Sequence, residues 1–248
     1  MDNMILFSCI ICTHNRGGYL EKAIQSLVNQ NMDKRWYEIL IIDNKSTDNT
    51  KGVVKTFSEA TPNLRYIHEP ELGVSSARNS GWKNANGKYV AYLDDDLVAE
   101  PDWLREMLET FRSTQKTIAA VGGRIDPIWE STRPGWLSPI LTRSLGLINW
   151  SSVPMTLRND QWLGEGNFAI RRQLLQHVGG FKTFLGRKGS KLLSHEGALL
   201  REQLKSIGFS YFYNPKITAW HHIPAYSGES CHPFRRKVAT FSPVLIPL

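Results

Sequence analysis

The sequence predicts a doubly wound α/β fold, in which a mostly parallel sheet has helices on both faces. Short apolar or β-branched runs alternate with longer segments of helical spacing over the first 125 residues, which is typical of βαβ units with right-handed crossovers. The chain has 248 residues, of which 41% are hydrophobic and 21% charged, and this is enough for one large core. Polar clusters follow several of the predicted strands, where such folds bind ligands.

The first half divides into alternating elements. We predict strands at residues 5–12, 37–42, 64–68, 88–93 and 118–122. We predict helices at residues 18–30, 48–60, 73–85 and 101–113. The first helix carries one apolar stripe, formed by Leu20, Ala23, Ile24, Leu27 and Val28.

The pattern breaks over residues 126–158, which are rich in proline and tryptophan. Their apolar side chains predict either packing against the body of the protein or a short amphipathic helix that covers the site or touches a membrane. Regular structure returns after residue 161, with a strand at 167–170, a turn at 179–180, a helix at 195–207 and strands near Tyr211 and Ile217. We therefore expect a first half at 1–125, a second half at 126–225 and a tail at 226–248, all within one continuous domain.

The charge and composition of the chain limit the kinds of binding partner that we expect. The net charge of +7 favours an anionic ligand, but the basic residues are spread along the chain, so we expect no nucleic-acid partner. We find neither an apolar run of roughly 20 residues nor the basic start and cleavage site of a secretory leader. Three cysteines favour a reducing compartment, and we expect a cytoplasmic protein. Arg235, Arg236 and Lys237 in the tail are typical of a solvated basic patch or of peripheral contact with the inner face of a membrane.

Three consecutive aspartates, Asp94, Asp95 and Asp96, end the apolar run of the fourth predicted strand. Neighbouring carboxylates repel one another, and a divalent cation relieves that repulsion. Hard oxygen ligands of this kind suit Mg²⁺ or Mn²⁺. The alternative is a solvated loop or a helix N-cap, since Pro101 and Asp102 predict that a helix begins soon afterwards.

Two other strand ends carry polar residues. Thr13, Asn15 and Arg16 follow the first strand, and Asp43 follows the second. Parallel strands bring these ends and the aspartates to one edge of the sheet. Such an edge offers a guanidinium for phosphate, a carboxylate for a base or ribose, and an acidic metal site, which together predict binding of a nucleotide diphosphate.

Several ordered strings resemble the inverting family-2 glycosyltransferases with the GT-A fold. They are CTHNR, IIDNKSTDNT, GVSSARNSGWKNANGKYVAYLDDD, GEGNFAIRR and GGF. The resemblance runs over roughly residues 5–225. It implies a Rossmann-like central sheet with an appended acceptor side, so that residues 1–125 would bind the donor and residues 126–225 the acceptor. It also implies transfer of a sugar from a nucleotide-diphosphate donor, expected to be a UDP-sugar, to a saccharide, lipid-linked or other hydroxyl acceptor.

The resemblance also implies roles for single residues. Thr13, Asn15 and Arg16 would line the donor, Asp43 would bind the base or ribose, and Arg78 would order the diphosphate or the acidic loop. Asp94 and Asp96 resemble the DxD aspartates, with Asp95 beside them in the donor site. A histidine after the last strand would complete the Mn²⁺ or Mg²⁺ site; because adjacent residues on a strand point to opposite faces, only one of His221 and His222 can do so, and we favour His222.

The acceptor side must supply a base, since displacement with inversion leaves a proton to remove from the acceptor hydroxyl. The segment LSHEGALLREQLKSIGF resembles the family's base motif and places Glu196 at the base position. Glu196 is otherwise an acid stabilised at a helix N-terminus. Trp162 and Asn167 resemble the acceptor-side loop, although a tryptophan here could equally belong to the core.

Two alternatives remain for the function as a whole. A non-catalytic nucleotide-sugar-binding module would keep the donor edge and lack a working base. A sugar-phosphate nucleotidyltransferase shares a related core but carries a glycine-rich basic signature near the first strand end, which THNRGGY matches poorly.

Overall fold

The computed structural model describes residues 4–133, 135, 137–138, 142–189 and 193–224. Most of the strands form one mixed sheet in the order β3, β2, β1, β4, β8, β6, β9, β5, and β7 pairs with β9 off this path. The strands are β1 (Phe7–Thr13), β2 (Tyr37–Asp43), β3 (Leu64–His68), β4 (Tyr89–Leu93), β5 (Leu97–Ala99), β6 (Ile118–Trp129), β7 (Met155–Thr156), β8 (Asn167–Arg171) and β9 (Ser210–Ile223).

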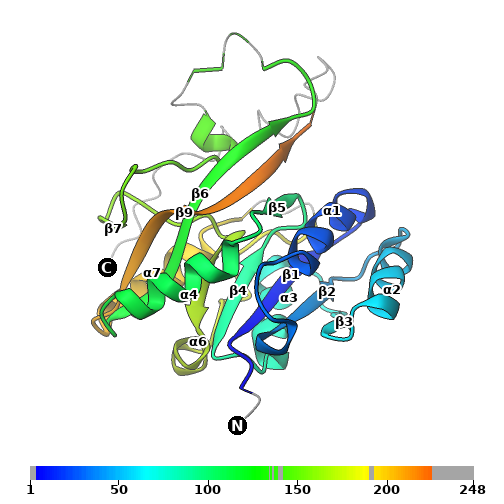
Figure 1. Cartoon of the computed structure of the whole chain (residues 1–248), viewed down its shortest axis with the longest axis horizontal. Helices are drawn as coiled ribbons and strands as arrows, with labels where there is room; N and C mark the ends of the chain where they lie inside the picture. Colours follow the sequence, from blue (N-terminus) through cyan, green and yellow to red (C-terminus); the bar gives the residue numbers. More distant parts are fainter. Residues whose placement is uncertain (1–3, 134, 136, 139–141, 190–192, 225–248) are drawn as a thin grey trace.

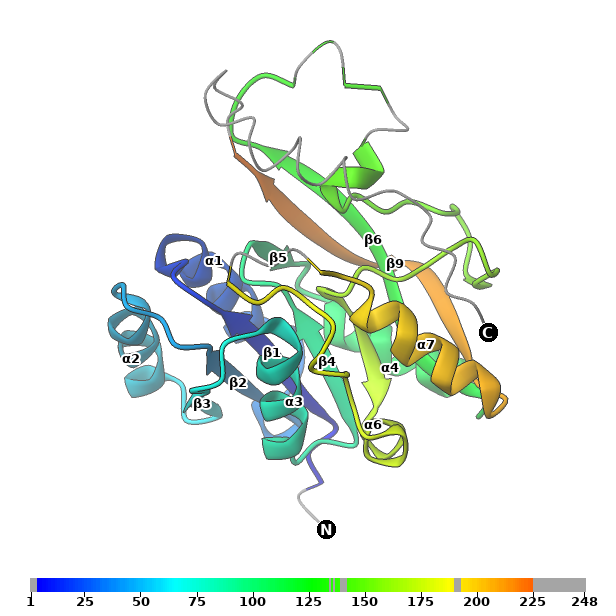
Figure 2. The same cartoon turned by 180° about the vertical axis from the view of Figure 1, so that it is seen from behind.

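Helices cover both faces of this sheet. The α-helices are α1 (Gly17–Val28), α2 (Thr50–Ala60), α3 (Val74–Asn84), α4 (Trp103–Ser113), α6 (Arg172–Val178) and α7 (Glu196–Ser206). The 3-10 helices are η1 (Lys34–Trp36) and η2 (Arg143–Leu145). Helices α1 and α4 lie in front of the sheet in Figure 1, whereas α3, α6 and α7 lie on the opposite face, seen from behind in Figure 2.

The donor-side half is a parallel sheet, as the sequence predicts. β1 pairs in parallel with β2 and β4, and β2 with β3, so their carboxyl ends reach one edge. All residues of β1, β2 and β4 except Cys12 are buried, which is why their sequences are almost continuously apolar. The antiparallel strand β8 then joins β4 to the second half of the sheet.

The second half differs from its prediction in several elements. Strand β6 runs on to Trp129, and β9 is one strand of 14 residues where two short strands were expected. These two strands pair in parallel along their length and project beyond the body in Figures 1 and 2. The expected boundary at residue 125 therefore falls inside β6. The short elements β5 and α6 were not predicted.

The proline- and tryptophan-rich segment packs against the body where the structure describes it. Leu137, Leu145, Leu147 and Ile148 are buried, and Ile148 exchanges backbone hydrogen bonds with Ile125. This agrees with packing against the core. The expected tail at 226–248 and part of this segment lie outside the described residues. Within the described residues no helix is both long and apolar enough to cross a bilayer.

Candidate functional site

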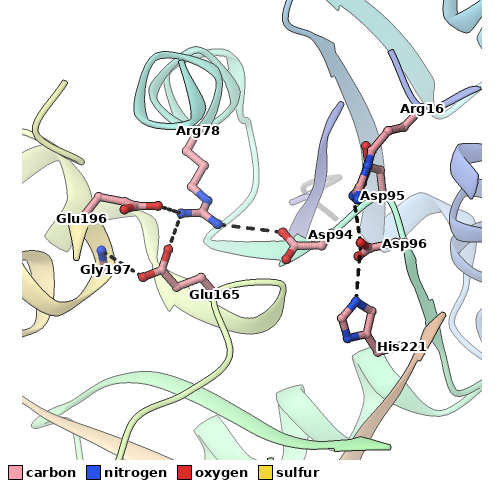
Figure 3. Close-up of polar contacts among 9 residues, drawn as sticks. All are labelled: Arg16, Arg78, Asp94, Asp95, Asp96, Glu165, Glu196, Gly197 and His221. Carbon is pink, nitrogen blue, oxygen red and sulfur yellow. Dashed lines mark hydrogen bonds and ion pairs between the residues drawn. The ribbon is translucent and has the colours of Figure 1, made fainter. Parts of the chain in front are cut away.

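The three aspartates lie in the turn between β4 and β5, opposite the end of β1. Thr13 Oγ1 donates to Asp95 Oδ2 at 2.8 Å. Arg16 Nη1 donates to Asp95 Oδ1 at 2.9 Å and to Asp96 Oδ2 at 2.8 Å (Figure 3). The structure therefore brings together four residues that the sequence assigned to one edge, and a single guanidinium pairs with two of the carboxylates.

The carboxyls of Asp95 and Asp96 have different environments. Burial raises the pKa of Asp95 to about 6, and the charge of Arg16 offsets only part of this effect. Burial also acts on Asp96, but His221 and Arg16 outweigh it and hold the pKa of Asp96 well below its usual range. Asp96 is thus the more firmly ionised of the two, as a metal-binding carboxylate must be.

The histidine beside the aspartates is His221. Its Nε2 lies 3.4 Å from Asp96 Oδ2 (Figure 3). His222 points to the other face of β9, where its Nδ1 lies 3.2 Å from Glu130 Oε1. The preference for His222 as a metal ligand does not fit this geometry, because the pairing of β5 with β9 sets His221 next to the strand that follows Asp96.

Asp43 and Asn15 shape the neighbouring loops. The buried carboxylate of Asp43 accepts hydrogen bonds from Ser46 N at 2.9 Å and from the hydroxyl of Tyr66 at 2.6 Å. Asn15 has a positive φ of 53°, and its side-chain oxygen accepts a hydrogen bond from Thr47 N at 2.7 Å. Asp43 and Asn15 therefore hold together the loops after β1 and β2, and both remain at the predicted donor edge.

Arg78 joins the donor edge to the acceptor side. It lies buried on α3, and its Nη1 donates to Glu165 Oε2 and, at 2.9 Å, to Glu196 Oε1 (Figure 3). Its Nη2 is 3.8 Å from Asp94 Oδ1. The guanidinium thus lies next to the acidic loop and also pairs with two glutamates, of which the sequence analysis assigned only Glu196.

A cavity of about 480 Å³ lies beside these glutamates. Its walls are mostly apolar and include Trp162, Phe168 and Tyr211, with Glu165 and His195 among its polar groups. Trp162 is 40% exposed, and its ring packs edge-on against Trp150 with the centroids 4.8 Å apart. An exposed aromatic ring in such a cavity suits stacking on the apolar face of a sugar.

Asn167 does not belong to this cavity. It is fully buried, its Nδ2 donates to the backbone oxygens of Arg124 and Ile217, and its Oδ1 accepts from Trp103 Nε1 at 2.6 Å. Every polar atom of its side chain thus has a partner in the core. The expectation that Asn167 contacts the acceptor is wrong, because no part of its amide is free to reach a ligand.

Comparison with known proteins identifies the family. The sequence profile described as Glycosyl transferase family 2 matches residues 8–183. The chain belongs to this family. Its resemblance to the family, read from the ordered motifs, is therefore confirmed.

Two curated relatives show how far the similarity extends. A glucosyl-dolichyl phosphate glucuronosyltransferase from Haloferax volcanii is 25% identical over 232 residues, which are 90% of this chain and 71% of that enzyme. The succinoglycan biosynthesis protein ExoM from Rhizobium meliloti is 30% identical over 185 residues, which are 73% of this chain and 57% of that protein. The chain thus matches little more than half the length of ExoM.

Solved glycosyltransferase structures share the fold. The mannosyltransferase PcManGT from Pyrobaculum calidifontis, in complex with GDP-Man and Mn²⁺, superposes with a TM-score of 0.67 at 21% identity, over 95% of this chain and 61% of that one. TarS 1–349 from S. aureus, in complex with UDP, gives 0.69 at 18% identity, over 95% of this chain and 64% of that one. The GT-A fold expected for this glycosyltransferase is confirmed.

Oxygens of the substrate would complete the coordination of a metal in this site. Among the described residues, no group of three His, Cys, Asp or Glu side chains forms a ready metal cage. Asp94, whose side chain is half exposed, and Asp96 still offer carboxylate oxygens at the same edge. One or two carboxylates together with phosphate oxygens are a usual ligand set for Mg²⁺, so these residues fit a cation shared with a diphosphate.

Proposed function

We propose that the chain is a metal-dependent inverting glycosyltransferase that uses a UDP-sugar and acts in surface polysaccharide or glycoconjugate synthesis. Membership of glycosyl transferase family 2 supports transfer of a sugar. The donor, the metal and the stereochemical outcome are our inference. The acceptor would be the hydroxyl of a saccharide or of a lipid-linked sugar, the latter because one relative is named as acting on glucosyl-dolichyl phosphate.

One structural observation carries this proposal. The acidic turn stands between Arg16, which contacts Asp95 and Asp96, and a second guanidinium, that of Arg78, which holds two further carboxylates. A guanidinium at one end suits a diphosphate leaving group, and carboxylates at the other end suit removal of a proton. A binding module without catalysis would need the first arrangement but not the second.

The donor would lie along the edge formed by the ends of β1, β2 and β4. Asp43 and the loop held by Asn15 would receive the nucleoside, and Thr13 and Arg16 the diphosphate. Asp94 and Asp96, with His221 beside Asp96, would hold Mg²⁺ or Mn²⁺, which when bound neutralises charge on the leaving diphosphate. Arg16 is half exposed where it lies beside the aspartates, so its guanidinium is accessible to the phosphates of a donor at this edge.

The acceptor would enter the cavity beside Trp162, where a sugar ring can stack. Its hydroxyl would then meet one of the two carboxylates that pair with Arg78, those of Glu165 and Glu196. The resemblance places Glu196 there. For a lipid-linked acceptor we also propose peripheral contact with the cytoplasmic face of a membrane. The basic tail that supports this contact, with Arg235, Arg236 and Lys237, lies outside the described residues.

Product analysis tests the proposal. Purified protein is incubated with UDP-, GDP- and dTDP-sugars and a panel of p-nitrophenyl glycoside acceptors, with Mn²⁺ or with EDTA, and the anomeric configuration of any product is read by NMR. We expect Mn²⁺-dependent transfer from a UDP-sugar with inversion at the anomeric carbon. Retention of configuration, or equal turnover in EDTA, contradicts the proposal.

A further inference from the structure

Trp162 lies on a short segment, residues 158–163, that closes on itself as a turn. Arg158 N donates to Gln161 Oε1 at 3.0 Å, and Gln161 N donates to Arg158 O at 3.1 Å. All residues of the segment except Arg158 line the 480 Å³ cavity. These two hydrogen bonds lie within the segment, so they fix its shape and leave its place beside the cavity to contacts with other elements.

Arg201 on α7 supplies such a contact. Its Nη1 donates to Gln161 O, and its Nη2 donates to Arg158 O at 2.8 Å. Both carbonyls belong to the residues that close the turn. Because the guanidinium is planar and its donors have fixed directions, two hydrogen bonds to one turn set the orientation of the segment as well as its distance from the helix.

Two aromatic rings support this arrangement. The guanidinium carbon of Arg201 lies 5.8 Å from the ring centroid of Tyr211, which is buried on β9 and lines the same cavity. Trp150 Nε1 donates to Trp162 O at 2.7 Å. The carbonyls of Gln161 and Trp162 thus both have fixed partners, which holds the ring of Trp162 beside the cavity.

The helix that carries Arg201 also borders the carboxylates of the site. Helix α7 begins at Glu196, which pairs with Arg78 together with Glu165 (Figure 3). Gly197 N, in the first turn, donates to Glu165 Oε1 at 3.1 Å. Arg201 follows in the second turn of the same helix. One rigid element therefore supports both the carboxylates and, through Arg201, the segment with Trp162.

We propose that Arg201 is a positioning residue for the acceptor, and this assignment rests on the proposed function. Arg201 holds Trp162 at a fixed place relative to the carboxylates beside the N-terminus of α7, so that a sugar stacked on the ring presents its hydroxyl to them. Arg201 acts through the backbone of residues 158–162 and takes no part in the proton transfer. The donor edge is built from other elements and does not depend on this contact.

Kinetics of Arg201→Ala test this role. With the best donor and a p-nitrophenyl glycoside, we expect the KM for the acceptor to rise by about 2- to 10-fold, as for loss of the Trp162 ring, while the Kd for UDP stays unchanged. Arg201→Lys keeps the charge but lacks the planar pair of donors, so we expect a similar rise in KM. An unchanged KM, or an equal loss of UDP affinity, overturns the assignment.

Arg171→Ala is the matched control. Arg171 also donates to a backbone oxygen, that of Ile118 at 2.8 Å, and lies over the ring of Tyr89 at 5.8 Å. It pairs with Tyr89 at the start of β4, whereas the acidic turn follows the other end of that strand. Arg171→Ala should leave the KM for the acceptor at the wild-type value. A rise in KM equal to that of Arg201→Ala would show that loss of any such arginine has this effect and would overturn the assignment.

The double variant Arg201→Ala/Trp162→Ala tests whether Arg201 acts through the ring. Without the ring there is nothing for Arg201 to position, so we expect the KM of the double variant to lie within about twofold of that of Trp162→Ala. If the effects of the two single substitutions multiply instead, Arg201 acts on the acceptor independently of Trp162 and the inference is wrong.

Limited proteolysis tests the contact without any turnover. The carbonyl of Arg158 that Arg201 holds belongs to the peptide bond that trypsin cleaves after Arg158. We expect Arg201→Ala to speed cleavage at this bond by at least about fivefold, read by mass spectrometry, with cleavage after the exposed Arg35 as the internal reference. Wild-type cleavage after Arg158, or an equal rise after Arg35, contradicts this inference alone, whereas a wild-type chain that transfers no sugar contradicts the proposed function.

Discussion

Arg16 Nη1 lies 2.8 Å from Asp96 Oδ2 and joins the loop after β1 to the acidic turn after β4. The same nitrogen lies 2.9 Å from Asp95 Oδ1, so one half-exposed guanidinium pairs with two carboxylates. The interaction keeps the acidic turn in place without a ligand. In the proposed function, a cation held by Asp96 would free Arg16 for phosphate oxygens, which would link the order of the turn to binding of the donor.

Replacement of Arg16 should weaken binding of the donor. Charge-assisted hydrogen bonds contribute about 1.5–3 kcal/mol, so we expect Arg16→Ala to raise the Kd for UDP by roughly 10- to 100-fold. Isothermal titration measures this change. The control is Arg35→Ala, which removes an exposed guanidinium paired with Asp33 on η1 and should leave UDP affinity as it is. Equal affinity of Arg16→Ala and wild type would exclude Arg16 from the phosphate site.

The two adjacent histidines should differ in their effect on metal dependence. We expect His221→Ala to raise the Mn²⁺ concentration for half-maximal turnover by about tenfold, because it removes a nitrogen next to Asp96. His222→Ala should leave that concentration unchanged and lower the unfolding midpoint, since His222 is buried against Glu130. A shift in the Mn²⁺ dependence with His222→Ala but not with His221→Ala would restore the preference drawn from the sequence.

Replacement of Trp162 should weaken binding of the acceptor and leave binding of the donor unchanged. Stacking on an aromatic ring is worth about 0.5–1.5 kcal/mol, so Trp162→Ala should raise the KM for a glycoside acceptor roughly 2- to 10-fold, with no change in the Kd for UDP. Trp36→Ala serves as control, because Trp36 is similarly exposed at 47% on η1. A parallel loss of donor affinity in Trp162→Ala would show that the ring supports the fold of the site and not the acceptor.

Asn167 should matter for stability. Asn167→Ala leaves the indole N–H of Trp103 and two backbone oxygens without partners in the core, each costing about 1–3 kcal/mol. We therefore expect the free energy of unfolding to fall by roughly 3 kcal/mol or more in urea titrations. Asn84→Ala, which removes one exposed hydrogen bond on α3, should change it by less than about 0.5 kcal/mol. A destabilisation of Asn167→Ala no larger than that of Asn84→Ala would contradict this role.

The donor half could be predicted from sequence because its signals are local. Strands β1, β2 and β4 are buried on both faces and read as apolar runs, and parallel pairing alone brings Thr13, Arg16 and the aspartates to one edge. No knowledge of side-chain contacts was needed for this step.

The acceptor half depends on register and on packing between distant segments. The pairing of Leu97 with His221 decides which histidine meets Asp96, and a short strand such as β5 has no sequence signal of its own. Glu165 accepts a hydrogen bond from the backbone nitrogen of Gly197, which comes 32 residues later, and only the folded chain brings the two residues together. An acid between two glycines, Gly164 and Gly166, is the one local feature that could have drawn notice to it.

The central claim is that Asp96 and a divalent cation together bind the diphosphate of a nucleotide sugar. It is tested by isothermal titration of UDP-, GDP- and dTDP-sugars into wild type, Asp96→Asn and the exposed-carboxylate control Asp33→Asn, each with Mn²⁺ and with EDTA. We predict that a UDP-sugar binds wild type and Asp33→Asn at least about tenfold more tightly with Mn²⁺, and that Asp96→Asn loses this gain. Equal affinity of wild type in Mn²⁺ and EDTA, or no binding of any donor, would contradict the claim.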